Sequence, residues 1–411
     1  MKSFICISEG CPENEIEGDF IARCCIKKGL LKAASVDNAD LIILNSCGFS
    51  KEAETFTLRR YKDIIDRKKH GARVIFAGCL PAINENILKE IGYDDFIISP
   101  RSMENIDRIL QESGDRSMGK SCESQDDIVS YLKQKEPFLI NAQSFTKKLI
   151  ALFPFMPPRW LWQTLHLPAD DTPFLRIGMG CLGQCTYCAI KHAKGSIKST
   201  SMQSIIKVVE QLVQQKHSLI ALSADDLGAY GQDIGTTITV LLKGILAVSD
   251  DFQLALRNCE PEWLINYWAS LEEIFKTGRI AYLITPIQAG SDKILSLMKR
   301  KYTIKEIYNV LKQIRNVSPR TIIRTHLIVG FPHEGIFDFL LTCLVLFKFP
   351  VDHVKLFAYS DRPKTEASTF PHKVSSHAIK MRLSILKIIF LVTFLKLSRW
   401  FPFGYWKKTR L

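Results

Sequence analysis

Short apolar runs alternate with amphipathic stretches along most of this 411-residue chain. In the first part, residues 1–112, buried strands are predicted at 3–7, 41–45 and 73–78, and helices at 17–31 and 51–70. Strands that alternate with helices favour a parallel sheet with helices packed on its faces. We therefore predict an α/β protein whose amino-terminal domain spans residues 1–112.

The same alternation returns in residues 171–368, the predicted second domain. Strand candidates lie at 173–179, 218–224, 252–258, 280–287, 322–331 and 351–359. Helical stretches such as 201–215 and 303–316 lie between them. Six strand–helix units favour a partial (β/α)6 barrel, in which ligands bind at the carboxyl ends of the strands.

Two segments differ from this pattern. Residues 113–170 are predicted to be a linker followed by an irregular arm, because a polar stretch precedes 151–167, which is apolar and contains three prolines and two tryptophans. Residues 369–411 form a predicted helical tail, apolar and basic. After Glu366 the chain has nine lysines and arginines and no acidic residue.

The overall composition restricts the class of protein. A net charge of +13 indicates either a generally basic surface or a polyanionic partner, such as RNA or an anionic membrane face. The chain has twelve cysteines but begins without the pattern of a secretory leader, which disfavours a disulfide scaffold and favours metal or redox chemistry in the cytoplasm. No charge-free apolar run reaches 18 residues, so no standard membrane-spanning helix is expected.

The stretch GCLGQCTYC (180–188) places Cys181, Cys185 and Cys188 directly after the first strand of the second domain. Three thiolates suit a soft metal centre. Zinc remains an alternative, but structural zinc normally takes four protein ligands, and His192 is better explained as part of the following polar loop. A 4Fe–4S cluster held by three cysteines leaves one iron open to a small molecule. The spacing therefore favours such a cluster.

Three further cysteines each close a strand-like run: Cys11, Cys47 and Cys79. Neighbouring glycines, Gly10, Gly48 and Gly78, permit tight turns beside them. Because the carboxyl ends of parallel strands share one edge, the three thiolates are predicted to converge there on a second cluster with an open iron. The alternative is three buried core thiols. The remaining six cysteines are predicted to be structural.

Polar residues after two other strand runs suit a nucleotide-like ligand. Ser223, Asp225 and Asp226 follow one run, and their side chains can accept from ribose hydroxyls or an ammonium group. Gln288 and Ser291 follow another run. Each group alone could equally be an ordinary loop with a helix cap.

These segments resemble the methylthiotransferases of the radical S-adenosylmethionine superfamily. The matching amino-terminal pieces are GCPEN (10–14), NSCGF with KEAE (45–54) and AGCLP (77–81). The matching pieces of the second domain are GCLGQCTYC with IKHAKG (180–195), DDLGAYGQDIG (225–235), PIQAGSDKIL (286–295), MKRKYT (298–303), HLIVGFPHE (326–334) and YSDRPKTEAS (359–368). Within the family, CLGQCTYC with KHAKG and GAYGQDIG most resembles the branch that acts on threonylcarbamoyladenosine in tRNA.

The resemblance implies two 4Fe–4S clusters and S-adenosylmethionine, which would occupy the fourth place at the cluster of residues 181–188, with its adenine near Tyr187. One S-adenosylmethionine would methylate a sulfur at the cluster of Cys11, Cys47 and Cys79. A second would be cleaved to a 5′-deoxyadenosyl radical that takes hydrogen from adenine C2, where the methylthio group is delivered. The implied partners are tRNA rather than DNA, and a reductant such as flavodoxin or ferredoxin.

The chain also departs from the family pattern. Family members usually end in a small β-rich substrate-binding module, whereas residues 369–411 predict a basic helical tail. His326 stands in place of the usual Asp, and Lys194 in place of a common Arg. Two other functions stay open: methylthiolation of a ribosomal protein or other peptide, and cluster binding without catalysis. The tail could contact a membrane surface, or it could pack on the barrel with basic residues facing RNA.

Overall fold

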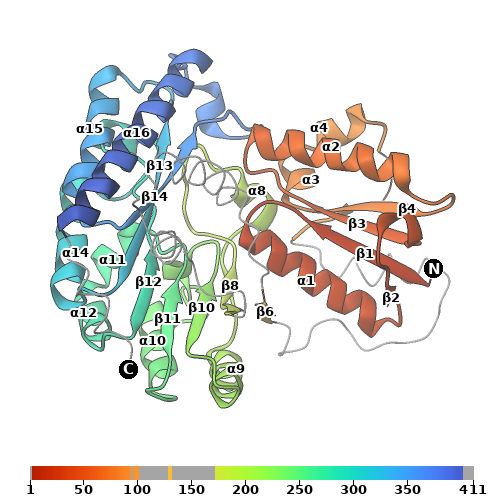
Figure 1. Ribbon diagram of the computed structural model, residues 1–411, viewed down its shortest axis with the longest axis horizontal. Coiled ribbons are helices and arrows are strands. Elements are labelled where there is room, and N and C mark those ends of the chain that lie inside the picture. Colours follow the sequence, from red (N-terminus) through yellow and green to blue (C-terminus); the bar gives the residue numbers. More distant parts are fainter. Residues whose placement is uncertain (1, 94, 96, 101–127, 132–171, 401–411) are drawn as a thin grey trace. The chain divides into compact units, whose positions relative to one another are not determined.

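The computed structural model describes residues 2–93, 95, 97–100, 128–131 and 172–400 (Figure 1). Two compact units divide the chain. Unit 1 consists of Met1–Ile177, Thr200–Ser223 and Ile245–Gln253, and unit 2 of Gly178–Ser199, Ala224–Gly244 and Leu254–Leu411. The predicted boundaries near residues 112 and 170 lie outside the described residues, so the four-part division of the chain stays a prediction.

A parallel five-stranded sheet forms the amino-terminal part of unit 1, in the order β2-β1-β3-β4-β5. The strands are β1 (Ser3–Ser8), β2 (Leu31–Lys32), β3 (Leu41–Ser46), β4 (Arg73–Gly78) and β5 (Ile97–Ile98). Every residue of β3 is buried, as expected for a central strand covered on both faces. The three predicted strands of this domain are confirmed.

Helices cover the two faces of this sheet: α1 (Pro12–Lys27) and α2 (Lys51–Arg67), with the short α3 (Cys79–Ile83) and α4 (Glu85–Glu90). Phe20 of α1 packs with Phe4 and Leu41 on one face, while Ile64 of α2 packs with Phe76 on the other. Helix α1 begins five residues before its predicted start, because Pro12 suits the first turn of a helix.

The second sheet has the strand order β14-β13-β12-β11-β10-β7-β6. Its strands are β6 (Val129–Tyr131), β7 (Pro173–Arg176), β10 (Leu219–Ser223), β11 (Gln253–Leu256), β12 (Ile280–Ile284), β13 (Ile322–Val329) and β14 (His353–Ala358). All six predicted strands are present. Strand β6, antiparallel to β7, falls within the predicted linker. The predicted strand 173–179 is interrupted at Ile177, and β8 (Gly178–Met179) pairs with β9 (Lys198–Ser199).

Helices follow the strands in sequence, as the (β/α) pattern predicts. They are α8 (Ile190–Lys194), α9 (Met202–Gln214), α10 (Ile238–Leu246), α11 (Pro261–Asn266), α12 (Trp268–Lys276), α13 (Asp292–Leu297), α14 (Ile304–Val317) and α15 (Ile336–Lys348). Short 3-10 turns lie at Val36–Asn38, Leu227–Ala229 and Glu366–Thr369. The predicted α/β class is therefore confirmed.

A helix is present in part of the predicted tail, α16 (Ser376–Trp400), whereas residues 401–411 lie outside the described residues. This helix packs on α15 and β14. The guanidinium of Arg382 donates to a carboxylate oxygen of Glu334 at 2.6 Å, and both residues are buried. Ile379 lies so close to Gly330 that a Cβ placed on this glycine would be 2.3 Å from Ile379 Cγ1. None of the helices in the described part of the chain is long and apolar enough to cross a membrane.

Candidate active site

The cysteine loop of residues 180–188 follows the short strand β8. Its first residue, Gly180, has φ +87°, and a Cβ placed there would lie 2.2 Å from the carbonyl oxygen of Ser196. The Cys181 N–H donates to the carbonyl oxygen of Gly195 at 3.1 Å. A glycine at position 180 thus lets the loop pack directly against the backbone at 195–196.

Gly183 lies between two of the predicted ligands. Its N–H donates to the Cys181 sulfur at 3.1 Å, and a Cβ placed on it would be 3.1 Å from that sulfur and 3.6 Å from the Cys185 sulfur. Burial raises the pKa of Cys185 to about 11 and also raises the pKa values of Cys181 and Cys188. Metal binding at these thiols must therefore displace protons. Backbone N–H donors to sulfur are among the groups that set the potential of an iron–sulfur cluster.

Asp225, predicted as a cofactor contact, is engaged by the protein itself. One carboxylate oxygen accepts from the Gly180 N–H at 2.8 Å, and the other lies 3.1 Å from the ammonium of Lys194. The Lys194 side chain is only 3 % exposed. Asp225 therefore joins the start of the cysteine loop to α8.

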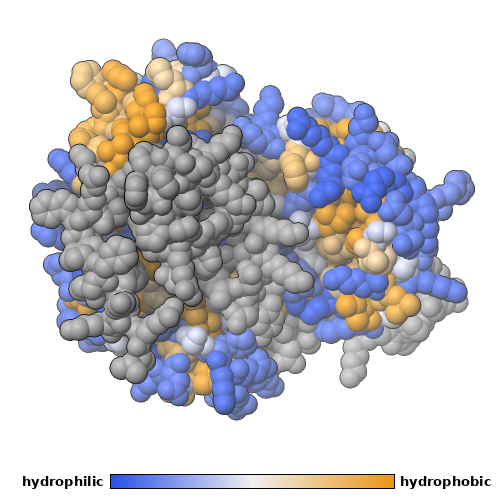
Figure 2. Space-filling view, viewed as in Figure 1, coloured by the Kyte–Doolittle hydropathy of each residue, from blue (hydrophilic) through white to orange (hydrophobic). Residues whose placement is uncertain are grey.

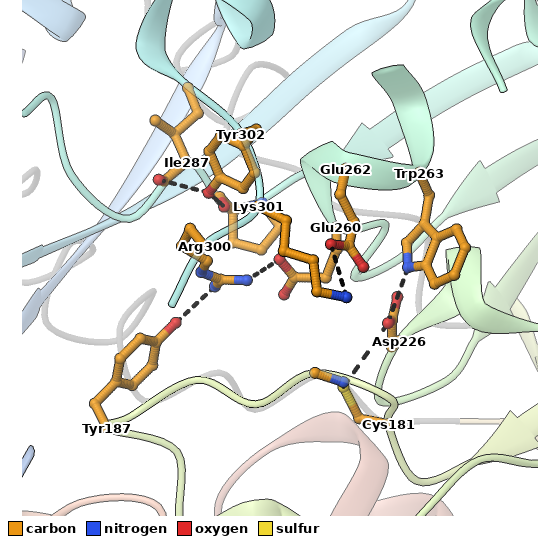
Figure 3. A network of polar contacts seen from close by, with 12 residues as sticks. Cys181, Tyr187, Asp226, Glu260, Glu262, Trp263, Ile287, Arg300, Lys301 and Tyr302 are labelled. Carbon is orange, nitrogen blue, oxygen red and sulfur yellow. Dashed lines mark hydrogen bonds and ion pairs between the residues drawn. The ribbon is translucent and has the colours of Figure 1, made fainter. Parts of the chain in front are cut away.

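Asp226 lies beside the cysteine loop (Figure 3). Its Oδ2 accepts from the Trp263 indole at 3.0 Å and lies 3.8 Å from the Cys181 sulfur. Its Oδ1 is buried and has no hydrogen-bond partner in the structure. Burial, and then the charge of Glu260, raise the pKa of Asp226 to about 7. Oδ1 is thus an acceptor available to a ligand with hydroxyl or ammonium groups.

Tyr187 is held by residues that the sequence analysis did not single out. Arg300 donates to the Tyr187 hydroxyl at 2.6 Å, and the same guanidinium forms an ion pair with Glu260 (Figure 3). Burial raises the pKa of Glu260, although the charge of Arg300 opposes this. Glu260 comes shortly after strand β11, just as Asp226 comes shortly after β10. A search for acidic residues after each predicted strand, which located Asp226, could therefore also have located Glu260.

Gln288 and Ser291 follow β12 but differ in their partners. The Gln288 backbone pairs with β13, since its N–H donates to the His326 carbonyl at 2.8 Å, while its buried Oε1 has no hydrogen-bond partner in the structure. Gln288 has φ +72°. The Ser291 hydroxyl donates to Asp338 at 2.7 Å. Gln288 therefore offers an acceptor to a ligand, whereas the Ser291 hydroxyl connects α13 to α15.

Ser223, at the end of β10 in unit 1, is fully buried. Its hydroxyl donates to the carboxylate of Glu13, which lies in the first turn of α1. This hydrogen bond ties the end of β10 to the segment that begins with Cys11.

The turns that contain the other three cysteines lie side by side at one edge of the amino-terminal sheet. A Cβ placed on Gly10 would be 2.4 Å from the Cβ of Cys47, and one placed on Gly48 would be 3.1 Å from the Cα of Leu80. Cys11 directly follows Gly10 in the sequence, and Cys79 directly precedes Leu80. Within the described residues, no three His, Cys, Asp or Glu side chains are grouped so that they could hold one metal ion.

Comparison with known proteins places these features in a family. Residues 3–99 match the uncharacterized protein family UPF0004, and residues 175–344 match the radical SAM superfamily. A probable threonylcarbamoyladenosine tRNA methylthiotransferase of Pyrococcus abyssi is 30% identical over 360 residues, which cover 87% of this chain and 77% of that protein. The chain belongs to the radical S-adenosylmethionine methylthiotransferase family.

A second relative of this methylthiotransferase is the ribosomal protein uS12 methylthiotransferase RimO of Trichlorobacter lovleyi, 28% identical over 92% of this chain and 78% of that protein. The radical S-adenosylmethionine methyltransferase TsrM of Kitasatospora setae has the same fold, with a TM-score of 0.59 at 11% identity over 90% of this chain and 77% of TsrM. Because it belongs to this family, the chain is a radical S-adenosylmethionine enzyme, and its cofactors are 4Fe–4S clusters and S-adenosylmethionine.

Proposed function

We propose that this methylthiotransferase inserts a methylthio group at C2 of a threonylcarbamoyl-type adenosine next to the tRNA anticodon, using two 4Fe–4S clusters. The observation that supports it most is the edge of the amino-terminal sheet, where three separate cysteine turns adjoin each other. A second triad of cysteines distinguishes enzymes that insert sulfur from other radical enzymes. Relatives from Pyrococcus abyssi and Pyrococcus horikoshii, 30% and 29% identical, are named for this tRNA reaction.

The residues of the second domain fit S-adenosylmethionine at the triad Cys181, Cys185 and Cys188. Bound there, the cluster and S-adenosylmethionine would supply the radical that removes hydrogen from the acceptor, and the second cluster would hold the sulfur that is methylated and delivered. Two buried acceptors, Asp226 Oδ1 and Gln288 Oε1, suit the hydroxyl and ammonium donors of this cofactor.

Tyr187 and the loop glycines have supporting roles in this proposal. Arg300 fixes the Tyr187 ring, which would flank the adenine of the cofactor. Gly183 leaves room for the cluster between two thiolates and donates to one of them. Asp225 and Ser291 act through the protein, because their carboxylate and hydroxyl groups bond to Lys194 and Asp338.

For the acceptor, the net charge of +13 favours a polyanion, since phosphate contacts dominate the affinity of proteins for nucleic acids. An adenosine in the anticodon loop can be unstacked, which makes its edge accessible to a buried site. The second candidate acceptor is a side chain of ribosomal protein uS12, because several relatives of similar identity are named for that reaction.

Anaerobic reconstitution with iron and sulfide tests the two clusters. About eight irons per chain are expected for the wild type, and about four for both Cys47→Ala and Cys185→Ala. Cys185→Ala should also lose cleavage of S-adenosylmethionine, whereas Cys47→Ala should retain it. A wild-type content of four irons or fewer, or retained cleavage in Cys185→Ala, contradicts the proposal.

Mass spectrometry of tRNA nucleosides from cells with and without the gene tests the acceptor. Loss of the 2-methylthio form of threonylcarbamoyladenosine in the deletion strain is the expected result. If the nucleosides are unchanged and the mass of a uS12 peptide shifts instead, the protein substrate is correct and the tRNA substrate is wrong.

A further inference from the structure

Helix α15 carries large apolar side chains on both of its faces. Phe339, Cys343 and Leu346 are buried against the rest of unit 2. The opposite side, which we call the α15 face, consists of Ile336 (55% exposed), Phe337 (79%), Leu340 (50%), Leu341 (45%), Leu344 (41%) and Phe347 (57%). These positions recur every three or four residues and so lie along one side of the helix. Figure 2 shows a hydrophobic patch over this helix at the upper left.

The neighbouring helix in sequence, α14, shows what an ordinary outward face looks like in this protein. Its exposed positions are all polar: Lys305, Glu306, Asn309, Lys312, Gln313 and Asn316. A helix of a globular protein normally has one apolar stripe toward the core and a polar face toward water. A large exposed apolar patch on one helix is typical of an interaction surface.

The exposed charges carried by α15 and α16 themselves have one sign. Lys348 is exposed at the end of α15, and Lys380 and Lys387 are exposed on α16, which packs on α15. The only acidic residue of either helix is Asp338, and it is buried and paired with Lys293. Residues 367–411 contain nine lysines and arginines and no acidic residue. The two packed helices thus combine an exposed apolar surface with exposed cations.

We propose that the α15 face lies in the interface of an anionic lipid bilayer, with α16 beside it. Apolar side chains that enter the acyl boundary, together with lysines that meet anionic headgroups, give the two signals that stable peripheral binding requires. Met381, Ile388 and Val392 of α16 are also partly exposed, which extends the apolar surface. In this proposal the protein binds the surface of the bilayer and does not span it.

Charge complementarity favours the bilayer over other partners. A second copy of the chain joined through the same face would place like charges opposite each other, because a two-fold interface pairs each patch with itself. RNA would bind the lysines through its phosphates, but phosphate contacts do not require six exposed apolar side chains.

Flotation of the full-length holoenzyme with vesicles under anaerobic conditions tests the proposal. Binding is expected to vesicles that contain phosphatidylglycerol, and at least about tenfold less to vesicles of phosphatidylcholine alone. The double variant Leu340→Glu/Leu344→Glu should lose flotation, and the milder Phe337→Gln should weaken it several-fold. Val240→Glu is the matched control, since Val240 is 48% exposed on α10 and should float like the wild type.

Iron content and circular dichroism establish that each variant is folded. Because Phe337 is 79% exposed, its substitution is compatible with the fold even where the double variant is not. Flotation of Phe337→Gln and of a folded double variant at the wild-type level overturns the proposal. It is also overturned if the wild type fails to float and light scattering shows a dimer that the variants abolish, which would assign the face to a second copy.

Discussion

The ammonium of Lys194 lies 3.1 Å from a carboxylate oxygen of Asp225, whose other oxygen accepts from the Gly180 N–H. The pair is almost completely removed from water and adjoins the loop that supplies Cys181. This pair therefore fixes the position at which the cysteine loop begins.

We expect Asp225→Asn to destabilise the protein by about 3–5 kcal/mol, because it leaves the charge of Lys194 buried without a counter-charge. Anaerobic urea denaturation measures this, and the iron content should fall in parallel. The control is Lys243→Ala, which removes an exposed ion pair with Glu273 and should leave the midpoint almost unchanged. Equal midpoints for the two variants would contradict the role of the pair.

The planar guanidinium of Arg300 donates a hydrogen bond to the Tyr187 hydroxyl and forms an ion pair with Glu260. Arg300→Lys should weaken the binding of S-adenosylmethionine about tenfold or more, because an ammonium cannot reproduce the fork that reaches both partners. Tyr187→Phe removes only the hydroxyl and should have the smaller effect. Equilibrium binding to the reconstituted protein measures the affinity, and unchanged iron content shows that the cluster is intact. An affinity equal to that of the wild type in Arg300→Lys would refute this arrangement.

Gly10 adjoins Cys47 with no space for a side chain, and its φ is +102°. Gly10→Ala should therefore displace the turn and reduce the iron content from about eight to about four per chain. Gly29→Ala is the matched control, because Gly29 has φ +84° but nothing within 4 Å of its added Cβ. It tests backbone strain without crowding and should retain the full iron content. Iron loss in both variants would show that backbone strain, and not crowding against Cys47, causes the loss.

Arg382 connects the tail to the loop after β13 through Glu334. Arg382→Met should cost about 3–5 kcal/mol, because the Glu334 carboxylate stays buried without its partner. Thermal denaturation of the holoenzyme measures the loss. Lys380→Ala, at an exposed position two residues away, should have the same melting temperature as the wild type.

His326 gives an expectation for pH dependence. Burial, and then the charges of Arg324 and Lys355, lower the pKa of His326 well below its usual value of 6.5. The unfolded state therefore binds a proton that the folded state does not, and the stability that neutral His326 contributes is lost as pH falls below about 6.5. His326→Gln should lose less stability between neutral pH and pH 5.5 than the wild type. A pH dependence in His326→Gln equal to that of the wild type would contradict this assignment.

The strands could be predicted because buried parallel strands are continuous apolar runs bounded by turn residues. The adjoining turns of Cys11, Cys47 and Cys79 could be predicted because each cysteine closes such a run, while their role as cluster ligands stays a prediction. Strand β6 was missed, since three residues make no recognisable pattern. Asp225 and Ser291 were predicted as ligand contacts together with Asp226 and Gln288. All four stay predicted ligand contacts, but their partners within the protein differ: Asp225 and Ser291 bond to other side chains, whereas Asp226 and Gln288 each keep a buried acceptor without a partner in the structure. The local sequence of a short polar residue after a strand does not reveal this difference.

The α15 face could not be foreseen either. A helix that is apolar on all sides looks from its sequence like a buried core helix. Its exposure depends on which elements cover it, and this is set by the packing of distant segments such as α16.

The two cysteine triads also differ in how far apart their members lie along the chain. Cys181, Cys185 and Cys188 share one loop, whose start is held by Asp225 and Lys194. Cys11, Cys47 and Cys79 follow three different strands, and their turns adjoin only after β1 has paired with β3 and β3 with β4. The proposed second cluster should therefore load only after the amino-terminal sheet has formed, whereas the proposed first cluster depends on one loop and the contacts that hold it.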